Sequence, residues 1–343
     1  MQKEISGRGR LLDENGELTQ KGYAKNLLLN YDRNHIKARG YRIKEWDYYL
    51  VYNDDFGVAL TIADNSYMAL LSVSLLDFKN IFYKTTSIIK PFTFGRLKLP
   101  TTSKIGDLSY KDKRIEIEFL HDGISRRLNC KMKNFNGEKN FECNLTLSEI
   151  GDDSMVIATP FKEDKKAFYY NQKINCMKAE GKAVYNDKTY MFSKDNSFGT
   201  LDWGRGVWTY KNTWYWGSAS GIVNGKSFGF NIGYGFGDTS AASENMIFYD
   251  GKANKLNDVT FNIPKNGDEY YYMKPWTFTS NDGRFEMDFI PLLDRKDNSS
   301  VGIISSKQHQ VFGKFTGKAV LDDGTVIEIR DFLGFAERVE NKW

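Results

Sequence analysis

The residues of this chain that are best suited to chemistry lie together in residues 198–216. Four of the seven tryptophans fall within this stretch, at positions 203, 208, 214 and 216. Asp202 and Arg205 stand among them, next to two glycines. A carboxylate and a guanidinium surrounded by large aromatic side chains are typical of a lined cavity. We therefore expect this stretch to form one wall of a pocket.

Asp202 is the first candidate for a catalytic acid or base, and Arg205 is the second catalytic candidate. Indole rings around Asp202 would exclude water and disfavour its charged form, whereas a nearby Arg205 would favour that form. In a catalytic pocket, either residue could protonate an alkene or polarise a carbonyl group. The alternative is that Asp202 and Arg205 form a structural pair that holds the loop in place.

The aromatic side chains around these two charges are the candidates for binding a ligand. The ring faces of Trp203, Trp208, Tyr210 and Trp214 could shelter positive charge that develops on a substrate. Tyr234 could form a hydrogen bond with a polar end of the ligand. The expected ligand-binding residues are Trp203, Trp208, Tyr210, Trp214, Trp216 and Tyr234. Two alternatives stand beside this interpretation: Trp214 and Trp216 only fill a core, and Tyr234 only packs on Tyr215.

The chain after this stretch predicts a β-hairpin. Residues 228–237 alternate between large side chains and small or amide ones, so one face of a strand is crowded. Asn224-Gly225 is typical of a type I′ turn. This turn sets a register in which Tyr215 faces Tyr234, Gly217 faces Ile232 and Gly221 faces Phe228. Large side chains that face glycines are typical of curved sheets, so we expect a barrel wall.

The rest of the chain predicts short strands. Alternating runs such as residues 114–119 and 141–147 are separated by turn residues at intervals of about 8–12 residues. Roughly 18 to 20 strands are expected, which is more than one small barrel holds. We therefore predict an all-β protein of two antiparallel barrels packed together, with few short helices. Residues 1–195 would form the first barrel and residues 196–343 the second.

Other polar residues are weaker candidates for a site. Glu244 and Asp238 follow the glycine-rich strand and could lie at a barrel mouth. Glu337 and Trp343 belong to the last segment, which could be a short strand or a helical turn, and we expect them to cap a barrel end. His309 has no visible partner, and we expect it to be exposed in a loop.

The composition argues against several kinds of partner. A net charge of +4, from 48 basic and 44 acidic residues, is too balanced for nucleic acid binding. Three cysteines and three histidines form no zinc pattern, and no phosphate-binding loop or nucleophile elbow occurs, so we expect neither a metal nor a cofactor. No stretch approaches the ~20 apolar residues of a transmembrane segment. The first residues lack an apolar signal region, which predicts a cytoplasmic protein. The sequence indicates no particular oligomeric state.

Several motifs resemble those of a bacterial family defined only by a domain of unknown function. They are Leu201-Asp-Trp-Gly-Arg-Gly-Val-Trp-Thr-Tyr210, Gln310-Val-Phe-Gly-Lys-Phe-Thr-Gly317, Leu321-Asp-Asp-Gly-Thr325 and Gly334-Phe-Ala-Glu-Arg-Val-Glu-Asn-Lys-Trp343. The resemblance extends over nearly the whole chain. This family by itself implies no activity.

More distantly, the chain is similar to the AttH and carotenoid 1,2-hydratase superfamily. Residues 179–181, residues 190–192 and Asp202-Trp203 occupy places similar to a glycine-bearing hairpin and a Trp-x-Asp-x-(Glu/Gln)-Trp-type motif of that superfamily. Asp-Trp-Gly-Arg-Gly stands here in place of Asp-(Arg/His)-(Glu/Gln)-Trp. The resemblance implies two lipocalin-like barrels.

This superfamily includes hydratases and cyclases that act on polyenes and terpenoids. The resemblance therefore implies a hydrophobic small molecule as ligand, and a cofactor-free hydratase, isomerase or cyclase as the activity. Two alternatives are a carrier of a lipid-like ligand without enzymatic activity, and a carbohydrate-binding protein whose tryptophans form a platform.

Overall fold

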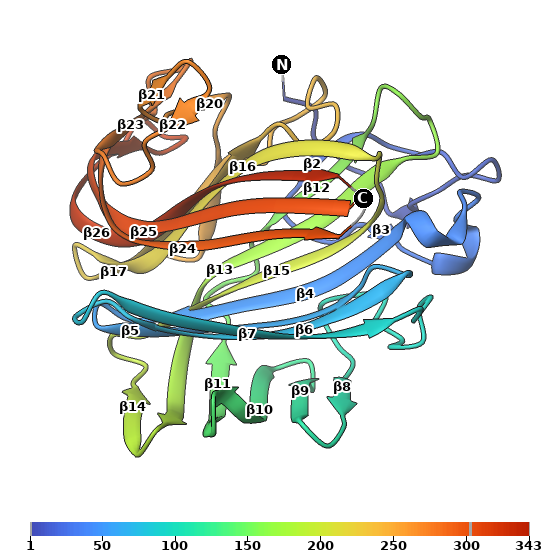
Figure 1. Cartoon of the computed structure of the whole chain (residues 1–343). Coiled ribbons are helices and arrows are strands. Elements are labelled where there is room, and N and C mark those ends of the chain that lie inside the picture. The colour runs from blue at the N-terminus through green and yellow to red at the C-terminus, as the bar shows by residue number, and fades with distance from the viewer. Residues whose placement is uncertain (1, 302–303, 343) are drawn as a thin grey trace.

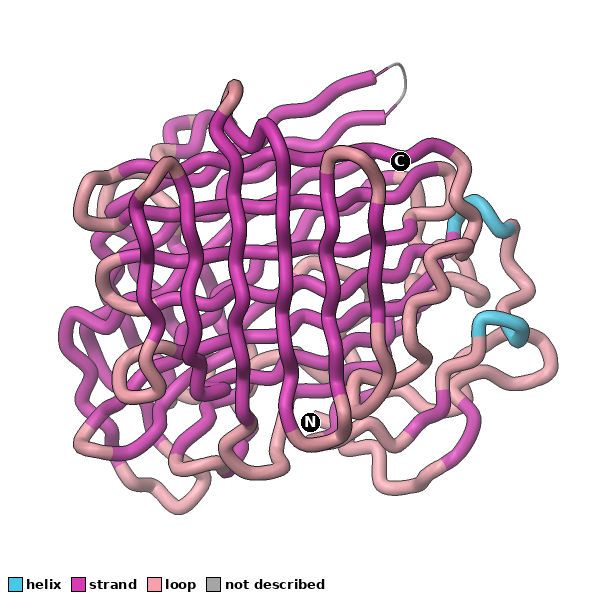
Figure 2. Tube along the Cα trace, turned by 90° about the horizontal axis from the view of Figure 1, so that it is seen from below, coloured by secondary structure: helices cyan, strands magenta, loops and turns pink. Residues whose placement is uncertain are grey.

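Two large antiparallel β-sheets make up most of the protein, whose computed structural model describes residues 2–301 and 304–342 (Figure 1). The described part of the chain contains no α-helix and only two 3-10 helices, η1 (Arg33–His35) and η2 (Gly40–Arg42). Figure 2 shows these helices together at one side of the strands. The predicted all-β class is therefore confirmed.

The first sheet contains most of the N-terminal strands and β15. Its hydrogen-bonded order is β7 (Phe82–Pro91), β6 (Met68–Asp77), β5 (Phe56–Asp64), β4 (Ile43–Tyr52), β15 (Phe198–Val207), β13 (Phe168–Tyr185), β11 (Lys139–Ser148), β10 (Ser125–Asn136), β9 (Ile115–His121) and β8 (Leu108–Lys111). Beside β13 lie β12 (Met155–Pro160) and β14 (Lys188–Phe192), and β2 (Gly22–Ala24) pairs with β12. A separate parallel pair consists of β1 (Gly9–Arg10) and β3 (Leu29–Asn30).

The second sheet contains the C-terminal strands. Its order is β19 (Lys252–Lys255), β18 (Met246–Tyr249), β17 (Lys226–Tyr234), β16 (Lys211–Val223), β26 (Val326–Lys342), β25 (Ile304–Val320), β24 (Phe285–Val301), β23 (Trp276–Ser280) and β20 (Val259–Asn262). A small hairpin of β21 (Lys265–Asn266) and β22 (Glu269–Tyr270) stands apart from it.

Each sheet curls into a half-barrel around a core of its own. In the first sheet, Thr86 Oγ1 on the edge strand β7 donates a hydrogen bond of 2.5 Å to the carbonyl oxygen of Phe135 in β10, near the other edge. In the second sheet, the rings of Tyr234 in β17 and Phe261 in β20 lie 5.6 Å apart, edge to face. These contacts join strands that are distant within each sheet. The predicted pair of barrel units is confirmed in this half-barrel form.

A third hydrophobic cluster packs the two half-barrels together. Leu50 and Tyr52 of β4 meet Trp216, Phe312 and Phe335 of the second sheet in this cluster. The Tyr52 hydroxyl accepts a hydrogen bond of 2.7 Å from the backbone N–H of residue 220 and lies 3.2 Å from the carbonyl oxygen of that residue. Because a buried tyrosine hydroxyl needs a polar partner, this contact sets where the sheets meet.

The hairpin predicted after residue 216 is confirmed in its register. Tyr215 faces Tyr234, Gly217 faces Ile232 and Gly221 faces Phe228 across β16 and β17. Asn224 and Gly225 have φ angles of 52° and 76°, as a type I′ turn requires at both central positions. Local turn chemistry was therefore sufficient to set the pairing of these two strands.

The change from the first sheet to the second falls later in the chain than expected. β15 was predicted in the second unit, but it is hydrogen bonded to β13 on one side and to β4 on the other, within the first sheet. The chain leaves that sheet after Val207, and β16 begins the second one at Lys211. The long central strands thus place residues 198–207 against the N-terminal half of the protein.

Three strands of the second sheet are longer than their sequence pattern predicts. β24, β25 and β26 each span 17 residues, whereas the alternating pattern supported only about half of this length. The last segment, which could have been a helical turn, is part of β26. These extensions carry polar side chains, and they reach along the first sheet to cover it.

Gly204 provides a test of how closely the side chains of β15 and β4 pack. It lies opposite Trp46 on β4, and a Cβ atom at this glycine would come 2.0 Å from Cζ2 of the Trp46 ring. We expect Gly204→Ala to displace this ring and to lower the free energy of unfolding by about 1–3 kcal/mol, the usual cost of overpacking. Chemical denaturation measures this change. Gly40→Ala is the matched control, because a Cβ atom there has no neighbour within 4 Å; equal stabilities of the two variants would contradict the prediction.

Candidate functional site

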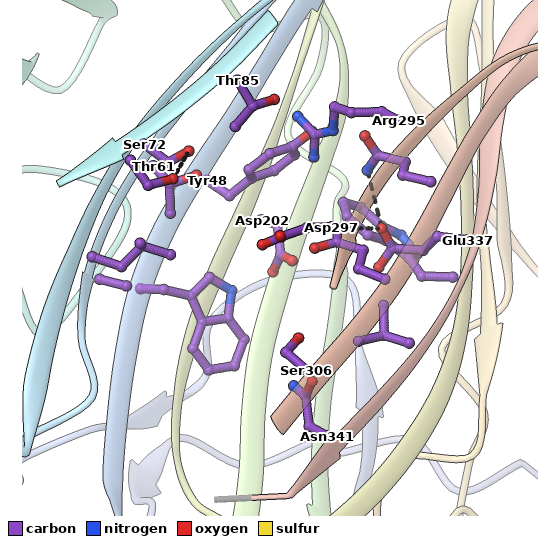
Figure 3. A pocket seen from close by; sticks show the side chains of 18 of the residues that line it. Tyr48, Thr61, Ser72, Thr85, Asp202, Arg295, Asp297, Ser306, Glu337 and Asn341 are labelled. Carbon is purple, nitrogen blue, oxygen red and sulfur yellow. Dashed lines mark hydrogen bonds between the residues drawn. The ribbon is translucent and has the colours of Figure 1, made fainter. Parts of the chain in front are cut away.

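A cavity of about 710 Å³ lies between the two half-barrels. One wall consists of β4, β5, β6, β7, β13 and β15 of the first sheet, and the other of β16, β24, β25 and β26 of the second. Figure 3 shows that Tyr48 and Asp202 from the first sheet face Arg295 and Glu337 from the second. The cavity is large enough for a small organic molecule.

Strand alternation in β15 decides which residues of the central motif reach this cavity. Asp202 lines it, whereas Trp203 is fully buried in the first core, where its ring lies 5.8 Å from that of Tyr170. Neighbouring residues of a strand point to opposite faces. Asp202 and Arg205 are three residues apart and therefore also point to opposite faces.

Asp202 is held by two partners on the adjacent strand β13. Lys173, directly opposite in the ladder, places its Nζ 2.9 Å from Asp202 Oδ2, and Asn171 Nδ2 donates to Asp202 Oδ1 at 2.6 Å. The same Nζ lies 4.1 Å from the ring centre of Trp216, which belongs to the second sheet. Asp202 is only 8% exposed. The site thus contains an oriented, nearly buried ion pair.

Arg205 has a structural environment away from the cavity. Its Nη1 lies 2.9 Å from Asp47 Oδ1 and donates to the carbonyl oxygen of Trp46 at 2.8 Å, while Nη2 donates to the carbonyl oxygen of Pro100 at 2.7 Å. The guanidinium is fully buried. The expected pair of Asp202 with Arg205 is therefore wrong, because the two side chains find different partners on opposite faces of β15.

Glu337 on β26 is a cavity residue whose role the sequence did not indicate. It is 4% exposed and accepts hydrogen bonds from Trp214 Nε1 at 3.1 Å and from Gln310 Nε2 at 3.1 Å. Burial raises the pKa of Glu337 to about 7, although the bond from Trp214 opposes the shift. We had expected a capping residue at a barrel end. Its place in the cavity follows from the unexpected length of β26.

Glu244 also lines the cavity, from the segment between β17 and β18. It is 7% exposed, and its carboxyl group lies against Gly233, where a Cβ atom would be 3.1 Å from Glu244 Cδ. Burial raises the pKa of Glu244, and the charge of Asp202 adds to this shift. Asp238, which was expected at a barrel mouth together with Glu244, is not among the residues that line the cavity.

The predicted ligand-binding aromatics divide into two groups. Trp208, Trp214 and Trp216 line the cavity together with Trp46, Tyr169 and Phe236, which the sequence did not single out. Trp203 belongs to the first core, and Tyr210 is 52% exposed outside the cavity lining. Tyr234 stacks on Tyr215 at 4.5 Å in the second core, outside the lining, as its alternative interpretation held.

His309 lies on the concave side of the second sheet, in β25 and not in a loop. Its Nδ1 is 2.8 Å from Asp294 Oδ2, and its ring stacks on Tyr272 at 3.8 Å. Within residues 2–301 and 304–342, no group of three or more His, Cys, Asp and Glu side chains could hold a metal ion. In the same residues, no helix is long and apolar enough to cross a membrane.

The hydrogen bond between Trp214 and Glu337 gives a test of the raised pKa. The carboxyl group is neutral below pH 7 and charged above it, because its pKa is about 7. We expect the tryptophan fluorescence of the folded protein to change with a midpoint near this pH, since Trp214 donates to the ionising group. Glu337→Gln should abolish the transition. A transition that persists unchanged in this variant would assign it to another group.

The buried pair of Arg205 and Asp47 gives a test of its structural role. Arg205→Gln leaves Asp47 buried without its cation, so we expect a loss of about 3–5 kcal/mol in the free energy of unfolding. The double variant Arg205→Gln/Asp47→Asn should lose less free energy of unfolding than the sum of the losses of the two single variants, because it contains no unpaired buried charge. Urea denaturation of the single and double variants measures this coupling. If the losses of the two single variants add up to the loss of the double variant, the ion pair does not contribute to the free energy of unfolding.

Comparison with solved structures shows a shared fold. A crystal structure from Nitrosomonas europaea, assigned as AttH, aligns with a TM-score of 0.58 at 13% identity, over 90% of this chain and 96% of that chain. The crystal structure of kievitone hydratase from Nectria haematococca aligns with a TM-score of 0.57 at 12% identity, over 97% of this chain and 98% of that one. Identities this low show the fold alone.

The relationship in sequence is with a protein family. No curated protein sequence matches the chain significantly. The family described as a domain of unknown function (DUF2804) matches residues 2–343, as its motifs predicted. The chain therefore belongs to the DUF2804 family.

Proposed function

We propose that this protein binds a mainly apolar small molecule between its half-barrels and catalyses the addition of water to a carbon–carbon double bond, or the reverse reaction. The observation that carries the proposal is the pair of carboxyl groups in different environments. Glu337 is buried with a pKa of about 7, while Asp202 is ion-paired with Lys173. Two such groups in one cavity can serve as an acid and as a fixed anion.

In the proposed reaction, Glu337 is the general acid. Its carboxyl proton passes to one carbon of the double bond, and the adjacent carbon becomes positively charged. The carboxylate of Asp202 and the surrounding indole rings stabilise this charge. A water molecule then attacks the cation, and its surplus proton returns to Glu337. No cofactor takes part, and the reaction starts again from a protonated acid.

The lining of the cavity supports an apolar ligand with some polar groups. Aromatic rings occupy one part, while hydroxyl groups of β5, β6 and β7 occupy another, including those of Thr61, Ser72 and Thr85 (Figure 3). A wholly apolar pocket would favour a simple carrier, but this cavity contains buried carboxyl groups. One of the solved structures with a similar fold is that of kievitone hydratase, which is compatible with the proposal.

The geometry of the tryptophans disfavours the carbohydrate-binding alternative. A sugar platform requires exposed, coplanar rings. Here the ring of Trp208 is inclined by 73° to that of Trp46 and by 66° to that of Trp214. Rings that meet edge to face do not form such a flat platform.

The test begins with the compound that the protein carries. Native mass spectrometry of protein purified from its own host, followed by organic extraction, would identify a bound molecule. This compound, and alkenes of the same class, would then be incubated with the protein in water labelled with heavy oxygen. We expect a product that has gained one labelled water. Glu337→Gln should slow its formation by about 10²–10⁴-fold, the usual contribution of a general acid.

Glu328→Gln is the matched control, because this glutamate is exposed on the same strand β26. It should react like the unaltered protein. A bound apolar compound that is never converted would favour the carrier instead. Equal rates for Glu337→Gln and the control would remove Glu337 as the acid.

A further inference from the structure

Glu244 has an unused hydrogen-bonding atom in the cavity. Its Oε2 is buried and has no hydrogen-bond partner within the described residues, although the side chain is almost fully buried. An unsatisfied carboxyl oxygen in the interior is costly, because its hydration is lost without replacement. Since Glu244 lines the cavity, a molecule bound there can provide the missing donor.

Aromatic rings line the same cavity as Glu244, and burial together with the charge of Glu244 raises the pKa of Tyr169. Phe236 is the central ring: its centre lies 4.8 Å from that of Tyr169, 4.8 Å from that of Trp208 and 5.3 Å from that of Trp214, each in an edge-to-face arrangement. Trp46 completes the set by stacking on Tyr169 at 6.1 Å. We call Trp46, Tyr169, Trp208, Trp214 and Phe236 the aromatic box.

The charges near Glu244 leave it without an ion-pair partner. The cavity lysine, Lys173, is already paired with Asp202. Lys255 also acts on Glu244, but its Nζ donates to Ser243 Oγ and to the carbonyl oxygens of Asn245 and residue 256. No salt bridge to Glu244 occurs among residues 2–301 and 304–342. Glu244 is therefore an acidic group of the cavity wall that no cation neutralises by direct contact.

The same cavity already stabilises a cation against an indole ring. Lys173 Nζ lies 4.1 Å from the ring centre of Trp216 while it pairs with Asp202. An ammonium group between aromatic rings and Glu244 would repeat this arrangement of one carboxylate and ring faces. Aromatic enclosures with a nearby carboxylate are well suited to substituted ammonium ions, which are weakly hydrated and attracted to ring faces.

We infer that the aromatic box and Glu244 form a subsite for a cationic nitrogen of the ligand. The inference rests on the proposed function, to which it adds the class of substrate: an apolar molecule that carries an amine or a quaternary ammonium group. The nitrogen lies in the box, and the reacting double bond extends towards Asp202 and Glu337. A protonated amine also donates a hydrogen bond to Glu244 Oε2.

The experiment compares two probes that differ only in charge. Benzyltrimethylammonium and its carbon analogue neopentylbenzene have the same shape, and quenching of tryptophan fluorescence reports their binding because three tryptophans of the box line the cavity. We expect the cation to bind more tightly. Glu244→Gln should weaken binding of the cation by about tenfold or more, because the attraction between the carboxylate and the trimethylammonium charge is lost, and leave the neutral probe unchanged.

Two controls keep the comparison interpretable. Glu244→Asp retains the charge and should retain most of the preference for the cation, and Glu328→Gln should behave like the unaltered protein. Thermal denaturation shows whether each variant is folded. If Glu244→Gln fails to fold, the preference of the unaltered protein for the cation over its neutral analogue decides the matter.

The outcomes separate this inference from the proposed function. Equal binding of the two probes, or a preference that survives in Glu244→Gln, overturns the cationic subsite and leaves an apolar cavity for the hydratase. Binding of neither probe also overturns the subsite. Selective binding of the cation together with unimpaired turnover in Glu337→Gln supports the subsite and contradicts the proposed mechanism.

Discussion

The ion pair of Lys173 and Asp202 is the interaction on which the cavity depends. Both charges are nearly buried, and such charges are tolerated only when they are paired and hydrogen bonded. Their strands are neighbours in the first sheet, while the ring over Lys173 belongs to the second. Together with this ring, the pair links the two half-barrels and places two charged groups in the cavity wall.

The three buried carboxyl groups of the cavity differ in their hydrogen-bond and ion-pair partners. Asp202 has a cation and an amide donor, whereas Glu337 has neutral donors and Glu244 has an oxygen without a partner. Desolvation is the largest cause of the raised pKa of both glutamates. A single cavity thus contains an ion-paired carboxyl group, a carboxyl group with neutral hydrogen-bond donors and a carboxyl group with an oxygen that lacks a partner.

The long strand β24 of the second sheet forms polar contacts with the first sheet beside the cavity. Arg295 on β24 donates from Nη1 to Ser74 Oγ at 3.1 Å, and the backbone N–H of Lys296 lies 3.4 Å from the hydroxyl of Tyr83 on β7. These contacts bridge the two sheets beside the hydroxyl-lined part of the cavity. They are polar contacts that hold the two sheets together beside the cavity.

The sequence alone determined the class of fold, most strands and the register of β16 with β17, because alternation and turn geometry act between near neighbours. It also pointed to Asp202, Trp208, Trp214 and Trp216. Only the tertiary structure decided that Arg205 pairs with Asp47 and that Asp202 pairs with Lys173. It likewise brought Glu337 and Glu244 into one cavity with Asp202. Such partners are distant in the chain, and their meeting depends on which sheet each strand joins and which face each side chain takes.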